Sequence, residues 1–227
     1  MLAFQSPASA LANAARTRAH VAAVVVAALC LGGIASAFWF EDLRYARPAH
    51  KPAEHVDVAL GATVGIAPEV EELFGERDAS RPLLLHFYNP DCPCSRFNVP
   101  YLRELVEQHR ERVDFALVVE CVDEAQVERA RAKVEADLPW VFDRDGAIAD
   151  RYGVYATPLA VIVAPDGRLV FRGNYASARY CTDPAKQAAR LALEGLLEVL
   201  EDGRTPLAPL EEILPYGCSL PSDRLAP

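Results

Sequence analysis

A stretch of twenty uncharged, mostly apolar residues near the start constrains this chain more than any other feature. Residues 21–40 read VAAVVVAALCLGGIASAFWF, and a helix of about twenty residues can cross the hydrocarbon core of a bilayer. Arg16 and Arg18 precede the stretch, and positive charge before a first apolar segment keeps that end in the cytoplasm. The sequence therefore predicts a single transmembrane signal-anchor helix over 21–40, with residues 1–20 cytoplasmic.

Everything after the apolar stretch is then expected outside the cytoplasm, in the periplasm if the cell is Gram-negative. A cleaved signal peptide is the alternative, because Ala-Ser-Ala at 35–37 resembles a cleavage site. The apolar stretch continues past that site as far as Phe40, which favours the uncleaved anchor.

The amino-acid composition of the chain excludes several classes of protein. The chain has 227 residues, 52% of them hydrophobic, which excludes a disordered chain. The formal net charge is −9, whereas a nucleic-acid-binding domain typically carries a positively charged surface, so no nucleic-acid partner is expected. Six cysteines are too few for a disulfide-dense scaffold. No histidine spacing typical of a metal site is present, and neither a metal nor a cofactor is expected.

Apolar runs after residue 80 alternate with segments of helical spacing, which is typical of an α/β domain with one mixed sheet. The runs at 159–164 and 169–172 flank Pro-Asp-Gly, a turn sequence that predicts a hairpin. A last helix is expected to begin at Thr182 or Asp183. The earlier predicted elements are strands at 83–88 and 113–122 and helices at 95–112 and 124–136. The predicted organisation is a linker at 41–65, a domain at 66–202 and a proline-rich tail at 203–227.

Two cysteines lie where the first strong strand turns into the first long helix. Residues 87–95 read FYNPDCPCS, so Cys92 and Cys94 are at the predicted start of the helix. The unpaired N–H groups and the positive end of the helix dipole favour a thiolate there, and the thiolate is the nucleophilic form. The sequence therefore predicts a reactive thiol at this corner. The alternative is that Cys92 and Cys94 are ordinary buried cysteines.

Residues 80–202 resemble a thioredoxin-fold protein of the membrane-tethered, extracytoplasmic kind. Residues 87–100 match the family's strand end, active-site corner and proline-containing helix, and Tyr-Ala-Thr-Pro at 155–158 resembles its cis-proline loop. The resemblance implies a thioredoxin-like fold, a central mixed sheet flanked by helices. It also implies a cis bond between Thr157 and Pro158, packed against Cys92. In the family, this loop binds the extended chain of the partner protein through its backbone.

The active-site sequence departs from the family pattern of two cysteines separated by two residues. Cys92 matches the first cysteine, whereas Ser95 stands at the place of the second and cannot close a disulfide. Either Cys94 or another cysteine must then resolve a mixed disulfide. The loop that ends at Cys181 is expected to emerge at the same sheet edge, which makes Cys181 a candidate. Cys121 is expected to be a buried thiol.

The role of Cys218 stays open at this point, because it can pair with Cys181 or fold back. His86, six residues before Cys92, takes the place of the family's buried acid. A histidine there can move the proton of the resolving thiol, since its ordinary pKa lies near the working pH. The alternative is a core histidine bonded to a backbone carbonyl.

These features together predict a thiol–disulfide oxidoreductase that acts on extracytoplasmic protein thiols and disulfides. Cys92 is the expected nucleophile, Cys94 or Cys181 the expected resolving thiol and His86 the expected proton carrier, while Thr157 and Pro158 bind substrate. One alternative is a Cu(I) or Zn module that uses these thiolates, with Cys121 or Cys181 as third ligand. A second alternative, favoured by Ser95, is a redox-inactive module that only binds proteins.

Overall fold

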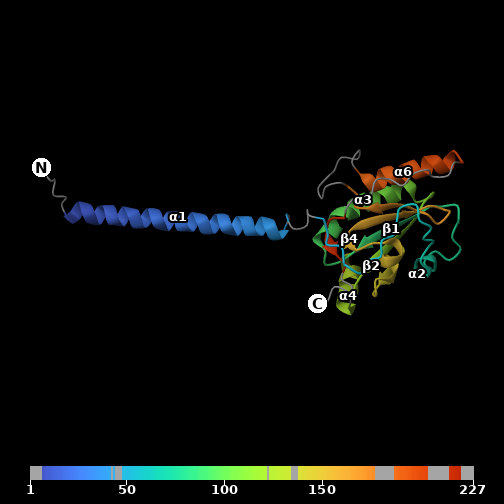
Figure 1. The fold of residues 1–227 in the computed structure, drawn as a ribbon, viewed down its shortest axis with the longest axis horizontal. Helices are drawn as coiled ribbons and strands as arrows, with labels where there is room; N and C mark the ends of the chain where they lie inside the picture. The colour runs from blue at the N-terminus through green and yellow to red at the C-terminus, as the bar shows by residue number, and fades with distance from the viewer. Residues whose placement is uncertain are drawn as a thin grey trace. The chain divides into compact units, whose positions relative to one another are not determined.

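The computed structural model describes residues 7–41, 43, 48–121, 123–133, 138–176, 187–203 and 215–220 (Figure 1). The chain divides into two compact units, residues 1–44 and 45–227. The helices are α1 (Pro7–Glu41), α2 (Pro68–Glu71), α3 (Pro93–His109), α4 (Glu124–Lys133), α5 (Ala147–Tyr152) and α6 (Ala188–Glu201). The strands are β1 (Leu83–Tyr88), β2 (Asp114–Glu120), β3 (Trp140–Asp143), β4 (Ala156–Thr157), β5 (Leu159–Val163), β6 (Leu169–Gly173) and β7 (Cys218–Ser219).

Helix α1 makes up nearly all of the described part of the first unit. Its segment Arg16–Phe40 has a mean hydropathy of 2.4, and none of its side chains is buried within the protein. An exposed apolar helix of 25 residues is long enough to cross a bilayer, a property that a signal sequence near the N-terminus shares. The apolar N-terminal helix expected from the sequence is therefore present.

The second unit contains a five-stranded mixed sheet in the order β3-β2-β1-β5-β6. Strands β1, β2 and β3 are parallel, and β5 and β6 are antiparallel to their neighbours. Tyr88 at the end of β1 is paired with Val119 near the end of β2, so both strands end at the same edge of the sheet. The two predicted strands are therefore present as parallel neighbours, and the β5–β6 pairing confirms the predicted hairpin.

Helices cover both faces of the sheet. Alternate side chains of each strand point to opposite sides, so each strand contributes to the packing on both faces. On one face Leu84 and Tyr88 of β1 pack with apolar residues of α3 and α6, and these helices lie together on that side in Figure 1. On the other face Leu85 and Phe87 pack with α5 and with Val70 of α2. The cis bond between Thr157 and Pro158 precedes β5. This is the thioredoxin-like arrangement that the resemblance implies.

Several segments differ from the sequence-based expectation. Strand β3 and helix α5 were not predicted, because four and six residues are too few for a clear periodicity. Helix α6 begins at Ala188 after Gln187 in an extended conformation, and the predicted caps Thr182 and Asp183 lie outside the described residues. Part of the expected linker packs against the domain instead, since Thr63 pairs with Arg168 next to the β5–β6 turn.

Candidate functional site

The site is built on the turn between β1 and α3. Cys92 is the N-cap residue of α3, with an extended backbone, and proline follows it in the first turn of the helix. The amide nitrogen of Cys92 donates to the Asn89 carbonyl oxygen at 3.2 Å, and the Ser95 amide donates to the Cys92 carbonyl oxygen at 3.1 Å. These bonds hold Cys92 at the positive end of a 17-residue helix, where a thiolate is stabilised.

Charged side chains from α4 hold the loop before Cys92. Arg129 donates two hydrogen bonds to the Asp91 carboxylate, at 2.9 and 2.8 Å. Gln126 donates to the same carboxylate, and Lys133 donates to the Pro90 carbonyl oxygen at 2.6 Å. The Arg129 bond holds the pKa of Asp91 below its ordinary value, so this carboxylate remains ionised at neutral pH. The loop is thereby tied to a second helix.

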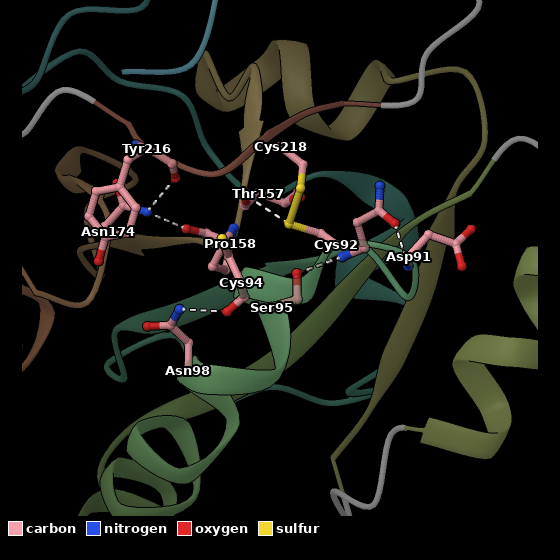
Figure 2. Close-up of a disulfide and its surroundings, with 11 residues drawn as sticks. Asp91, Cys92, Cys94, Ser95, Asn98, Thr157, Pro158, Asn174, Tyr216 and Cys218 are labelled. Atoms are coloured by element: carbon pink, nitrogen blue, oxygen red, sulfur yellow. Dashed lines mark hydrogen bonds between the residues drawn. A yellow bond between two sulfur atoms is a disulfide. The ribbon is translucent and has the colours of Figure 1, made fainter. Parts of the chain in front are cut away.

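Cys92 is bonded to Cys218 in a disulfide that joins positions 126 residues apart in the sequence (Figure 2). Their Cα atoms are 6.0 Å apart, within the usual range for a disulfide. The Cys92 sulfur also lies 3.6 Å from the Thr157 carbonyl oxygen, the residue before the cis proline. The predicted cis bond is present, and its loop lies against Cys92 as expected.

The partner cysteine reaches the site on a short strand from the tail. Strand β7 pairs antiparallel with β4, which places Thr157 opposite Cys218 and Ala156 opposite Ser219. Beyond this pairing, the Leu220 amide donates to the Tyr155 carbonyl oxygen at 3.3 Å. Part of the proline-rich tail therefore extends the backbone of the cis-proline loop as an added strand.

The two thiols predicted to resolve the mixed disulfide are Cys94 and Cys181. Cys94 is a fully buried thiol in the first turn of α3, and its carbonyl oxygen accepts a hydrogen bond from the Asn98 side chain at 3.2 Å. Ser95 is also fully buried, and its hydroxyl accepts from the Asn89 amide at 3.3 Å. Cys181 lies outside the described residues. In this structure Cys92 is therefore paired with Cys218 rather than with Cys94.

His86 is fully buried on β1, on the face covered by α3 and α6. Its Nδ1 atom lies 2.9 Å from the Tyr175 hydroxyl, and its Nε2 atom has no hydrogen-bond partner among the described residues. Burial lowers the pKa of His86 to about 3, so the imidazole is neutral at pH 7. The match between its ordinary pKa and the working pH, on which its expected proton-carrying role rests, is therefore lost. The partner is a tyrosine and not the backbone carbonyl of the alternative interpretation.

Metal binding finds little support within the described part of the chain. Those residues contain no group of three histidine, cysteine or carboxylate side chains arranged to hold a metal ion. Cys121, a possible third ligand in the metal interpretation, is buried at the end of β2, and burial raises the pKa of its thiol.

The sequence did not single out Cys218 as the partner of Cys92. Local patterns such as hydrophobic periodicity do not indicate which residues pair when they are 126 positions apart. The only hint is Tyr-Gly-Cys at 216–218, a glycine beside a cysteine in a proline-rich tail. Asn174, whose side chain contacts this segment, lies in the loop expected to emerge at this edge of the sheet, but nothing in the sequence singled it out.

Known proteins with a similar structure have low sequence identity to this chain. No curated protein matches this chain, whereas 143 chains of solved structures are similar to its structure. A hypothetical protein from Sinorhizobium meliloti is 19% identical, with a TM-score of 0.56 over 74% of this chain and 96% of that one. A secreted disulfide oxidoreductase from Mycobacterium tuberculosis is 22% identical, with a TM-score of 0.38 over 53% and 82%. The thioredoxin domain of a thiol-disulfide oxidoreductase from Bacteroides vulgatus is 14% identical, with a TM-score of 0.43 over 63% and 99%.

The profile of a family described as a domain of unknown function, DUF6436, matches residues 66–206. The matched segment contains the sheet, the Cys92 corner and the cis-proline loop, and it ends before β7. The chain therefore belongs to the DUF6436 family and has a thioredoxin-like fold.

Proposed function

We propose that the protein is a membrane-anchored thiol–disulfide oxidoreductase that acts outside the cytoplasm, with Cys92 as its nucleophile. The observation that carries the proposal is the position of Cys92. It caps the N-terminus of α3, lies against the cis-proline loop and is already engaged in a disulfide with Cys218. A helix N-terminus favours the thiolate, which is the form that attacks disulfides.

Cys92 and Cys218 then form the dithiol–disulfide couple. In the reduced protein, the Cys92 thiolate attacks one sulfur of a substrate disulfide, and the other substrate sulfur leaves as a thiolate. The Cys218 thiolate next attacks the Cys92 sulfur of this mixed disulfide and expels the second substrate thiolate. The substrate disulfide is thereby reduced to two thiols while Cys92 and Cys218 are oxidised, and the reverse sequence oxidises a substrate dithiol.

The sequence-based candidates have defined places in this scheme. Thr157 and Pro158 bind the extended chain of the substrate beside Cys92. Cys94 and Cys181 remain candidate resolving thiols alongside Cys218, which has the advantage of a disulfide in the structure. His86 remains a candidate proton carrier, although a neutral imidazole with a pKa of about 3 is poorly matched to a thiol.

Helix α1 supports the anchoring part of the proposal. Its apolar segment is long enough to span a bilayer, and Arg16 and Arg18 at its start favour a cytoplasmic N-terminus. The domain after it then lies in an oxidising compartment, where a disulfide persists. In spheroplasts, a membrane-impermeant maleimide should label Cys92 and Cys218 after mild reduction. Labelling only after lysis would contradict this topology.

The redox proposal is tested on the full chain in detergent, equilibrated in glutathione buffers from reducing to oxidising. After acid quenching and alkylation, peptide mapping is expected to find one reversible disulfide between Cys92 and Cys218. The Cys218→Ser variant should accumulate a mixed disulfide on Cys92, and Cys94→Ser serves as the matched control. If Cys92 enters no reversible disulfide in any buffer, the proposal fails.

A further inference from the structure

The tail segment at residues 215–220 lies between two other backbones. On one side β7 pairs with β4, opposite Thr157. On the other side Tyr216 pairs with Pro48, and the Ala49 amide donates to the Pro215 carbonyl oxygen at 2.7 Å. The segment thus occupies the edge of the cis-proline loop, with its cysteine bonded to the nucleophile.

Asn174 recognises the backbone of this segment two residues before its cysteine. Its side chain is fully buried, and its carboxamide oxygen accepts a hydrogen bond from the Tyr216 amide at 2.9 Å. The carboxamide nitrogen donates to the Tyr216 carbonyl oxygen at 3.0 Å and to the Pro158 carbonyl oxygen at 2.8 Å (Figure 2). Asn174 therefore bonds both polar groups of residue 216, as a neighbouring β-strand would, and connects them to the cis proline.

The tyrosine side chain adds a second contact. Tyr216 is buried, and its hydroxyl donates to the Ala176 carbonyl oxygen at 3.0 Å. A buried aromatic ring with a satisfied hydroxyl is a favourable anchor for a bound segment.

The residue between Tyr216 and Cys218 has to be glycine. Gly217 has a φ of +127°, a backbone conformation that L side chains rarely adopt. A Cβ atom on Gly217 would also collide with the Thr157 carbonyl oxygen. This is the same oxygen that lies 3.6 Å from the Cys92 sulfur, so a side chain there would disturb the reacting position itself.

We propose that Asn174, the cis-proline loop and Cys92 form a binding site selective for extended polypeptides with the pattern Tyr-Gly-Cys. Residues 215–220 are its internal occupant. The inference rests on the proposed function, because the bound cysteine is the one whose disulfide Cys92 attacks. An external segment binds after the tail has left the loop, and the returning tail displaces it when Cys218 attacks the mixed disulfide.

The test uses the full chain in detergent with Cys218→Ser, so that Cys92 is a thiol. Each of two peptides, Pro-Tyr-Gly-Cys-Ser-Leu and Pro-Tyr-Ala-Cys-Ser-Leu, carries thionitrobenzoate in a disulfide on its cysteine. The Cys92 thiolate attacks the peptide sulfur, a Cys92–peptide disulfide forms, and thionitrobenzoate leaves as a coloured thiolate. Mass spectrometry confirms the adduct, and the rate of each peptide with glutathione corrects for its intrinsic reactivity.

The glycine peptide is expected to react about tenfold faster than the alanine peptide, from the cost of a side chain at a positive φ. Corrected rates within about twofold of each other would overturn the inference and leave the proposed function standing. If neither these peptides nor a small disulfide modifies Cys92, the proposed function fails and the inference falls with it.

A second chain variant tests whether the tail is the internal occupant. In Gly217→Ala/Cys218→Ser the tail meets the same collision as the alanine peptide, so its hold on the loop is weakened. The glycine peptide should then react several-fold faster than with Cys218→Ser alone. A rate no higher than that of the single variant would contradict the assignment of residues 215–220.

The contribution of Asn174 is measured as a ratio. Asn174→Asp keeps the shape of the side chain and removes both hydrogen bonds donated by its nitrogen. The change is made in Gly217→Ala/Cys218→Ser, in which the tail already binds the loop weakly. The rate for the glycine peptide, divided by the rate for glutathione disulfide, should fall about fivefold or more, because the peptide loses the bond to its tyrosine carbonyl and the site loses the bond to Pro158. A purely structural role would lower both rates together, and an unchanged ratio would exclude Asn174 as a positioning residue.

Discussion

Cys92 and Cys121 follow neighbouring parallel strands at the same edge of the sheet, and both are almost completely buried. Cys92 is at the N-terminus of α3 and bonded to Cys218, whereas Cys121 is a thiol at the end of β2. Burial raises the pKa of Cys121, and carboxylates that include Glu120 raise it further, against the opposing charge of Arg144. The two side chains are buried to nearly the same extent, so burial does not explain why they differ. The difference comes from the charges around each thiol and from the tail, which brings Cys218 to Cys92.

The largest effect is expected when the reactive cysteine itself is replaced, and it concerns the rate of thiol–disulfide exchange. Cys92→Ser should lower the rate of thiol–disulfide exchange by about 10³-fold or more, because a hydroxyl does not attack a disulfide. Cys121→Ser is the matched control, and it should stay within about twofold of the wild-type rate. The rates are compared on one protein disulfide at one pH. Equal loss in the two variants would show that the strand ends are equivalent.

Opening the tail disulfide should have the next largest effect. The loop that it closes is long, with the two cysteines 126 positions apart in the sequence, and removing such a cross-link typically costs about 2–4 kcal/mol. Denaturant unfolding of Cys218→Ser should show this loss, and amide exchange at residues 216–220 should become faster. Combining Cys92→Ser with Cys218→Ser should cost no more than either change alone. If the stability losses of the two single variants add up in the double variant, the two residues do not stabilise the protein through a common disulfide.

A third prediction concerns the reactivity of the two thiols. In the fully reduced chain at pH 7, iodoacetamide should modify Cys92 at least about tenfold faster than Cys121, since only the thiolate reacts. The rate at Cys121 should keep rising above about pH 8.5, the ordinary thiol range, because its pKa is raised. Peptide mapping after timed quenching gives both rates. Similar rates at pH 7 would remove the proposed advantage of the helix N-terminus.

The smallest expected effect comes from the carboxyl group beside Cys121. Burial, with Asp143 nearby, raises the pKa of Glu120 well above its ordinary value, so the folded chain holds a proton that the unfolded chain releases. Stability should therefore fall as the pH rises above about 4, until the raised pKa is passed. Glu120→Gln should be more stable than wild type by roughly 1–2 kcal/mol at pH 7 and equal to it near pH 4.

Asp143→Asn provides the control for this last change. Asp143 accepts hydrogen bonds from the Ile148 and Ala149 amides at the start of α5, at 3.2 and 2.8 Å. Replacing its carboxylate weakens those bonds, although burial raises the pKa of Asp143 as well, so the gain in stability at pH 7 is expected to be smaller than that of Glu120→Gln. Equal stabilisation by both variants would point to a general effect of acidic charge rather than to burial of Glu120.

Much of the fold could be predicted from local patterns. The apolar run at 83–88 coincides with β1, and the turn at 165–167 joins β5 to β6. Short elements such as β3 were missed because four residues carry too little periodicity, and their pairing is decided by neighbouring strands.

The sequence by itself determined the apolar N-terminal helix, the alternation of strands and helices, and a cysteine at the start of α3. Each of these follows from residues close together in the chain, through hydrophobic periodicity and helix geometry. Only the tertiary structure decided that Cys218 is the partner of Cys92 and that Asn174 binds the tail. Those contacts join residues 126 and 42 positions apart, and they form only after the sheet has brought β4 and the tail to the same edge.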